Sequence, residues 1–279
     1  MKGFYLYCIR GSVAGDKKIS AKGGSASGGK MKGVPSAKEF GIVSFKDIEA
    51  IIGEVDLSEF NEKKIEDNLR TDPKWTENNI RRHHDVIAQT YKTGAVIPMK
   101  FGIIFRTKKN LAAMLKKHYQ EFKKLLAGLS GKGEWGVKIY LEDEKFTEWL
   151  KENNEEEKKL EKDKSAMPAG RQWYADKKIA ESIAAQFEEE IEHRLQAVVK
   201  SLADCCEEAV LCNLLPKEAT EAGRDNVLNA ACLVDNNKLD VFKKLLQHLE
   251  KEFNQIGGAL KVTGPWPPYN FVEMKNEKT

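Results

Sequence analysis

The sequence predicts an α+β protein with two domains. Short aliphatic and aromatic runs typical of strands are separated by longer segments in which apolar residues recur at three- and four-residue steps, which is typical of amphipathic helices. Between the two parts lies a segment dominated by lysine, glutamate and asparagine. We therefore expect an N-terminal domain over residues 1–142, a charged linker or solvated helix over 143–170, and a smaller C-terminal α+β domain over 171–279.

The order of elements in the first domain predicts a ferredoxin-like sandwich. Its expected elements are strands at Gly3–Arg10, Gly41–Phe45 and Ile48–Val55, a helix over about Asn61–Thr93, a strand over Ala95–Phe105, a helix over Lys108–Leu129 and a closing strand over Glu134–Leu141. Gly94 should end the first helix. The glycine-, serine- and lysine-rich stretch from Gly11 to Lys38 is expected to be a flexible loop.

A long helix is predicted to open the second domain. It should run over about Trp173–Glu208, because apolar residues from Ile179 to Cys205 form one stripe at three- and four-residue steps. The elements after it are expected in the order strand, strand, helix, strand: Ala209–Leu215, Val227–Val234, Leu239–Phe253 and Ala259–Thr263. The five cysteines are an odd number without paired spacing, so we expect them to be small hydrophobes in a reducing compartment.

The run VTGPWPPYNFV, Val262–Val272, holds three prolines, one glycine and three aromatic residues. Each proline fixes its own φ and removes a backbone donor, and the glycine lets the chain turn. We predict a rigid corner in which Trp266 ties the C-terminal segment to the body of the protein and stabilises the second domain, while Tyr269 contributes to a partner surface. The candidate structural or partner-binding residues of this corner are Trp266, Pro267, Pro268, Tyr269 and Phe271.

A second group of candidates lies in the run VIPMKFGIIF, Val96–Phe105. Proline cannot donate a hydrogen bond to a neighbouring strand and glycine permits close backbone approach, so this run should be an edge or bulged strand. Two interpretations are open: a local bend in a packed sheet, or an edge to which a β-rich partner adds a strand. The candidate residues are Pro98, Phe101 and Gly102.

Charge and hydropathy argue against two classes of function. The 46 basic and 43 acidic residues leave a net charge of only +3, so no strong field marks the chain as a nucleic-acid binder. The longest apolar stretches are too short to cross a bilayer, and the N-terminus begins a strand rather than a secretion signal. We therefore expect a cytoplasmic protein without nucleic-acid or membrane partners.

The motif search predicts no cofactor, metal ion or catalytic residues. GKGEWG (Gly131–Gly136) matches a dinucleotide fingerprint but follows a predicted helix and opens a strand, the reverse of the required context. GSASGGK (Gly24–Lys30) lacks the Ser or Thr of a phosphate loop at Met31. His83 and His84 are adjacent on a predicted helix and diverge by about 100°, so they cannot hold one ion without other ligands. We assign them a structural hydrogen-bonding role, with acid-base chemistry as the alternative.

Several blocks, taken in their order along the chain, resemble the gas vesicle accessory proteins of the GvpF/GvpL family. They are FYLYCIRG, HHDVIAQTYKTGAVIPMKFGIIF, GEWGVKIY, AGRQWYADKK and TGPWPPYNFV. The resemblance implies an N-terminal ferredoxin-like domain, a C-terminal α+β domain and a role in assembling gas vesicles. It also implies association with the shell-forming protein GvpA or with other accessory proteins, and a location at the gas vesicle. The stretch from Gly11 to Lys38 departs from the family, many of whose members have a shorter loop.

Two hypotheses of function follow. The first is a non-enzymatic assembly factor or minor structural component that binds the hydrophobic shell subunit and limits its premature association. The second is a small-molecule-dependent enzyme with a site in an interdomain cleft, using His83 or His84, Arg81 and Tyr174. We favour the first because the sequence offers no convergent catalytic constellation.

Overall fold

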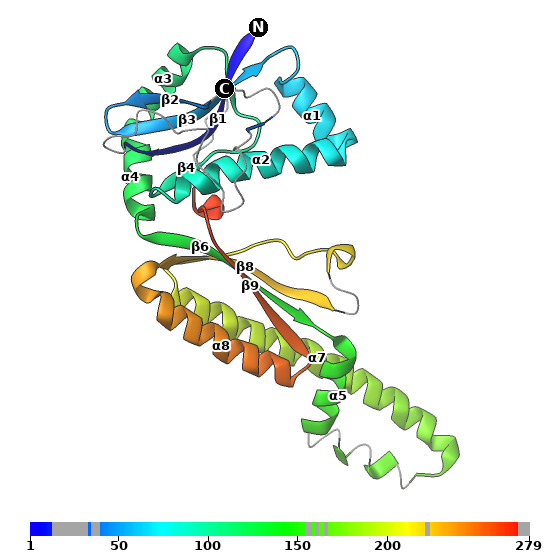
Figure 1. Cartoon of the computed structure of the whole chain (residues 1–279). Coiled ribbons are helices and arrows are strands. Elements are labelled where there is room, and N and C mark those ends of the chain that lie inside the picture. Colours follow the sequence, from blue (N-terminus) through cyan, green and yellow to red (C-terminus); the bar gives the residue numbers. More distant parts are fainter. Residues whose placement is uncertain are drawn as a thin grey trace, which may run out of the picture. The chain divides into compact units, whose positions relative to one another are not determined.

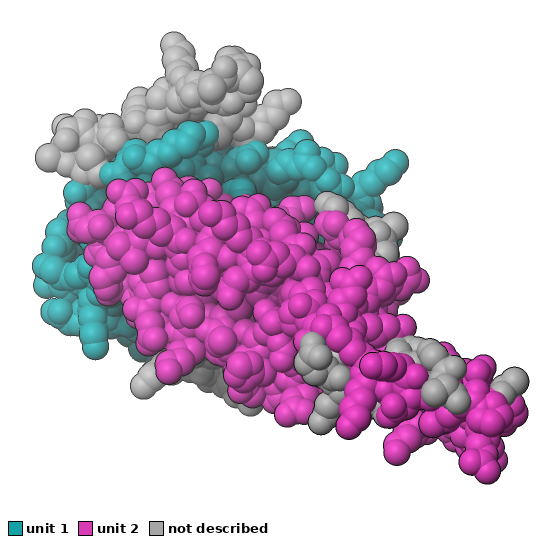
Figure 2. Space-filling model, turned by 90° about the horizontal axis from the view of Figure 1, so that it is seen from below, with its two compact units in different colours: residues 1–133, 266–279 teal, residues 134–265 magenta. Residues whose placement is uncertain are grey.

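The computed structural model describes residues 1–12, 33–34, 40–153, 158–159, 162–164, 167–220 and 224–272. The chain divides into two compact units (Figure 2): unit 1 is Met1–Gly133 with Trp266–Thr279, and unit 2 is Glu134–Pro265. The chain thus leaves unit 1 after Gly133 and returns to it at Trp266. Within the described ranges, no helix combines the length and the hydropathy that a membrane span requires.

Unit 1 is built on an antiparallel sheet whose central strand is the first in the chain (Figure 1). The strands are β1 Lys2–Gly11, β2 Phe40–Phe45, β3 Ile48–Asp56, β4 Val96–Pro98 and β5 Ile104–Phe105. Their order is β2-β3-β1-β4, and β5 also pairs with β1. Because β1 has neighbours on both sides, its segment Tyr5–Ile9 is fully buried.

The helices of unit 1 are shorter than the sequence pattern predicts. They are α1 Glu62–Thr71, α2 Pro73–Tyr91, α3 Lys108–Lys117 and α4 Tyr119–Leu129. The prediction of one helix over Asn61–Thr93 is wrong because Pro73 lacks a backbone N–H and disfavours helical geometry at Asp72. Asp72 instead caps α2, and its Oδ1 accepts from the N–H of Trp75 at 2.9 Å. The helix predicted over Lys108–Leu129 is likewise interrupted, at His118 (φ −100°, ψ 15°).

The flexible loop predicted from Gly11 to Lys38 lies mostly outside the described residues. Of its described part, Val34 is buried in unit 1. The Val34 N–H donates to Oη of Tyr7 at 3.1 Å. This position of the predicted loop therefore contributes to the core.

Unit 2 is built on a second sheet, with helices α7 and α8 lying side by side along it (Figure 1). Its strands are β6 Lys132–Leu141, β7 Glu208–Leu211, β8 Asp225–Asp235 and β9 Gly258–Trp266, in the order β7-β8-β6-β9. Its helices are α5 Asp143–Asn153, α7 Ala169–Cys205 and α8 Leu239–Gln255. Short 3₁₀ turns lie at η1 Lys217–Ala219, η2 Asn236–Lys238 and, in unit 1, η3 Tyr269–Phe271.

Both sheets share one strand order. In each, the first strand lies between the third and the fourth, and the second strand is at an edge. In addition to this strand order, the elements of unit 2 follow one another in the β-α-β-β-α-β succession of a ferredoxin-like fold. The predicted α+β class is confirmed. The prediction that Glu134–Leu141 closes the first sheet is wrong, because β4 fills that position and β6 lies between β8 and β9 in the second sheet.

The domain boundaries differ from those expected. The units meet in sequence at Gly133–Glu134, not at 142–143, because β6 pairs with strands of unit 2. Part of the expected linker over 143–170 is the helix α5, whose Phe146 and Leu150 are buried in the core of unit 2. These side chains are four residues apart and so share one helix face, which the charged composition obscures. The corner after Trp266 belongs to unit 1 rather than to the C-terminal unit.

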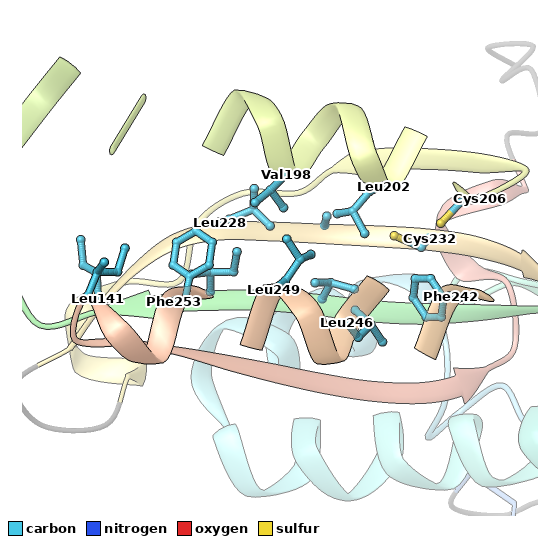
Figure 3. Close-up of a cluster of buried hydrophobic side chains, with 14 of the residues drawn as sticks. Leu141, Val198, Leu202, Cys206, Leu228, Cys232, Phe242, Leu246, Leu249 and Phe253 are labelled. Carbon is cyan, nitrogen blue, oxygen red and sulfur yellow. The ribbon is translucent and has the colours of Figure 1, made fainter. Parts of the chain in front are cut away.

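The core of unit 2 combines aliphatic side chains with phenylalanine (Figure 3). It joins side chains from α7, α8 and the sheet, among them Leu141, Val198, Leu202, Leu228, Phe242, Leu249 and Phe253. Cys206 and Cys232 are buried in it as free thiols, as Cys8 is in unit 1. The expectation of small buried hydrophobes is thus confirmed for these cysteines, whereas Cys205 and Cys212 are half-buried.

Phe146→Ala should destabilise unit 2, because the ring is fully buried and lies edge-on to Phe187 of α7 at 4.8 Å. Truncating a buried phenylalanine costs about 3–5 kcal/mol. Chemical denaturation followed by hydrogen exchange of unit 2 peptides measures the effect. Lys151→Ala, an exposed change on the same helix, is the control. If the two variants unfold at the same denaturant concentration, α5 is a linker after all.

Candidate functional site

The candidate residues of both groups lie in unit 1, and the structure relates them through two adjacent histidines of α2. Neighbouring residues on a helix point about 100° apart. His83 therefore turns into the core, where it meets the segment after β4, while the half-buried His84 meets the C-terminal corner.

A buried hydrogen-bonded chain runs through His83. Its Nε2 lies 2.9 Å from the carbonyl oxygen of Met99, so this nitrogen carries the proton and donates. Its Nδ1 then accepts from Oη of Tyr5 at 2.9 Å. Tyr5 Oη in turn accepts from the N–H of Gly102 at 3.1 Å. The chain joins β1, α2 and the link between β4 and β5.

That link is a bend between two short strands that pair with successive parts of β1. Gly102 adopts φ +97°, a conformation that side-chain-bearing residues rarely take. Pro98 is buried, and Phe101 is half-buried with its ring 5.7 Å from that of His83. The predicted edge position is confirmed for β4, but all three of its residues are buried and α2 and α4 contact it. The geometry favours a packed bend over a strand-recruiting edge.

Burial sets the protonation states in this chain. Desolvation lowers the pKa of His83 to about 4. Desolvation also raises the pKa of Tyr5 above its ordinary value. At neutral pH both groups are therefore uncharged, and both ring nitrogens of His83 are occupied by hydrogen bonds. This arrangement positions the backbone and leaves no nitrogen of His83 for acid-base chemistry.

The C-terminal corner presents aromatic rings beside His84. Nδ1 of His84 lies 2.8 Å from Oη of Tyr269, and the His84 ring lies 5.5 Å from that of Trp266. Trp266 is 40% exposed and Tyr269 is 37% exposed. We call His84, Trp266 and Tyr269 the aromatic patch. Beneath it, the corner is anchored by the buried residues Pro267, Pro268 and Phe271.

Two features of the corner differ from the sequence-based expectation. Trp266 was expected to stabilise the C-terminal domain, but it belongs to unit 1 and remains partly exposed. His84 was not expected to take part. A signal was available in the pair of histidines, since only one of two adjacent helical side chains can face the core. Its partner Tyr269, 185 positions away, carries no such signal.

The structure gives each residue of the enzyme hypothesis its own surroundings. His83 is buried, Arg81 pairs with Glu77 on the same helix, and Tyr174 is exposed on α7 in unit 2. No cluster of three or more potential metal ligands occurs in the part of the chain that the structure describes.

A groove in unit 2 escaped the sequence analysis. It has a volume of about 790 Å³ and lies between α7, the start of β8 and the segment after β7. Leu211 and Leu214 are exposed at its side. The apolar run Ala209–Leu215 was interpreted as a strand, but β7 ends at Leu211.

Comparison with known proteins gives a consistent result. The family model described as gas vesicle synthesis protein GvpL/GvpF matches residues 3–273. Gas vesicle protein F1 of Halobacterium salinarum is 23% identical over 247 residues, covering 88% of this chain and 86% of that protein. Gas vesicle protein L of Streptomyces sp. (strain CB03234) is 25% identical over 248 residues, covering 83% of this chain and 82% of that protein.

Solved structures show the same fold. The crystal structure of GvpF from Anabaena sp. PCC7120 matches with a TM-score of 0.67 at 15% identity, covering 99% of this chain and 98% of that one. GvpF from Microcystis aeruginosa matches with a TM-score of 0.62 at 17% identity, covering 98% of this chain and 99% of that one. The fold is therefore shared with these proteins.

Unit 1 should lose stability as the pH falls from 6.5 to 4. The pKa of His83 is about 4 in the folded protein and 6.5 in an exposed histidine, so the unfolded chain binds the extra proton first. The contribution of His83 to the free energy of unfolding is fully present above pH 6.5. About 3 kcal/mol of it is lost as the pH falls to the pKa of His83 in the folded protein. Denaturation monitored by hydrogen exchange of unit 1 measures it.

His83→Gln should be less stable at neutral pH but should show a shallower decline over this pH range. His84→Gln, at the neighbouring half-buried position, is the control and should keep the slope of the parent. An unchanged slope in His83→Gln would show that other groups cause the decline.

Phe271→Ala should destabilise unit 1 more than Trp266→Ala. Phe271 is buried, so its truncation should cost about 3–5 kcal/mol, whereas the partly exposed Trp266 should cost about 1–2 kcal/mol. Thermal and chemical denaturation of both variants test the order. The reverse order would mean that Trp266 is the anchor of the corner.

Proposed function

This chain belongs to the GvpL/GvpF family of gas vesicle synthesis proteins, and on that basis we propose that it is a non-enzymatic accessory protein of gas vesicle assembly that binds the shell-forming protein GvpA. It would act at the gas vesicle and in the cytoplasm where the shell is built. Binding would shield the hydrophobic shell subunit until it joins the growing wall. Other accessory proteins of the vesicle are further partners in this proposal.

The observation that carries the proposal is the aromatic patch on its rigid support. Tryptophan and tyrosine dominate the energetics of protein interfaces because they bury a large area at a small cost in side-chain entropy. Here both rings are partly exposed, while the buried prolines and Phe271 hold the backbone that carries them. Such preorganisation favours binding. The hydrogen bond between Tyr269 and His84 further restrains the Tyr269 ring.

The chemistry of the histidines supports a binding role over an enzymatic one. His83 has both nitrogens engaged inside the core, and His84 contacts a tyrosine and a tryptophan. General acid-base catalysis needs a group that can reach a substrate proton. The alternative, a small-molecule-dependent enzyme, has no comparable observation in its favour.

Tyr269→Ala and Trp266→Ala should each weaken capture of GvpA about tenfold or more, as loss of an interface hot spot does. The measurement is co-purification of GvpA with the full chain, scaled to the amount of folded protein. Trp173→Ala and Tyr174→Ala are matched controls, since they remove the same residue types at exposed positions of α7 in unit 2. The controls should capture GvpA as the parent does.

The same variants, expressed in a vesicle-forming host that lacks its own copy, should restore buoyancy in the order of their GvpA capture. Normal capture by both patch variants, with normal vesicles, would remove the aromatic patch from the proposal. Normal vesicles in the host without any copy would contradict the assembly role itself, provided that the host has no second family member.

A further inference from the structure

The groove of unit 2 has a helix as its longest wall. From α7 it is lined by Glu188, Ile191, Glu192, Leu195, Gln196, Val199, Lys200 and Ala203. Val227–Asn229 of β8 lie along it, and the segment from Leu211 to Leu214 forms the other side. We call this feature the α7 groove.

The helical wall consists of two parallel ridges. One ridge is apolar and repeats every four residues: Ile191, Leu195, Val199 and Ala203. The other is one position later and polar: Glu188, Glu192, Gln196 and Lys200. Residues four apart lie one above another on a helix, so each ridge is a continuous row that a second helix can pack against.

The side chains of the apolar ridge are only partly buried within unit 2. Ile191, Leu195 and Val199 touch the core cluster on one side but are only partly buried. Across the groove, Leu211 is 62% exposed and Leu214 is 56% exposed. An occupant that removes the aliphatic side chains on both sides of a groove from water lowers the free energy of the complex.

The charges of the polar ridge identify the occupant. Glu192 and Lys200 lie four positions before and four positions after Gln196, with opposite signs. Among the described residues Lys200 makes no ion pair, and Glu192 accepts a hydrogen bond only from its neighbour Gln196, at 3.0 Å. When two copies of this helix lie antiparallel about a twofold axis at Gln196, Glu192 of each copy faces Lys200 of the other. The contact then contains two pairs of opposite charge.

Other arrangements match this pattern less well. Two parallel copies would place Glu192 against Glu192. Glu188 lies as far before Gln196 as Asp204 lies after it, so these two acidic residues would pair; Glu188 is the first residue of α7 that lines the groove and Asp204 does not line it, which places this like-charged pairing at the end of the contact. The ridge is therefore complementary to itself in reversed direction, which is what a twofold dimer interface requires.

We propose that the α7 groove binds a second copy of this chain. The two α7 helices pack antiparallel through their apolar ridges, and Glu192 of each copy pairs with Lys200 of the other. Leu211 and Leu214 of each copy close the contact along its sides. The groove belongs to unit 2 and the aromatic patch to unit 1, so the residues of this dimer contact are distinct from those proposed to bind the shell protein.

Charge exchange tests the proposal with the purified full chain alone. The parent should sediment as a dimer that dissociates on dilution. Glu192→Lys alone, or Lys200→Glu alone, replaces two attractions by two repulsions and should weaken association about tenfold or more. The double variant Glu192→Lys/Lys200→Glu restores both pairs and should recover the parental association. High salt should reduce the difference between the single variants and the parent.

Glu189→Lys is the matched control, an exposed charge reversal on α7 that does not line the groove, and it should dimerise as the parent does. Leu211→Glu should weaken the dimer in both the parent and the double variant. A parent that is monomeric at every concentration overturns the proposal, as does a double variant that fails to recover. If the groove variants instead lose capture of another vesicle protein while the parent is monomeric, the occupant is that protein.

Discussion

Unit 1 depends on one buried histidine that must remain neutral. His83 accepts from Tyr5 and donates to the carbonyl of Met99, so α2 is held to the central strand and to the bend after β4 by the same ring. A protonated ring could not accept from Tyr5, and burial disfavours the charge. The register that this contact imposes on α2 also determines where His84 emerges, and with it the position of the aromatic patch. The core and the surface of unit 1 therefore share one constraint.

The two units have the same strand order but differ in the residue types of their cores. Each places its first strand between the third and the fourth, but unit 1 adds buried tyrosines and a histidine to its aliphatic core, whereas the core of unit 2 combines leucine and valine with phenylalanine. Polar aromatic groups need hydrogen-bond partners when buried, which explains why directional contacts determine the geometry of unit 1. Among the described residues, the core cluster of unit 2 contains no tyrosine or histidine that needs such a partner, and the apolar ridge of its long helix is partly exposed.

Local periodicity in the sequence predicted most strands and the helices α7 and α8 of unit 2, because a period of two or of 3.6 residues reports which face of an element is buried. It could not predict partners. Glu134–Leu141 is a strand as expected, yet nothing in its residues says which sheet it joins. Phe146 and Leu150 were hidden by the charges around them. The contact between His84 and Tyr269 joins positions 185 apart, so the pattern around each says nothing of the other.

Unit 2 is an insertion between two parts of unit 1, and this has a consequence for the order in which the protein is made. All of unit 2 leaves the ribosome before Trp266 does, so its core can form while unit 1 still lacks the corner. His84 is synthesised before unit 2 and Tyr269 after it, so the two residues cannot make contact until the whole inserted unit has been synthesised. A nascent chain can therefore possess both cores and still have no aromatic patch. The capacity of that surface to engage a partner appears only after the corner that follows unit 2 has been synthesised.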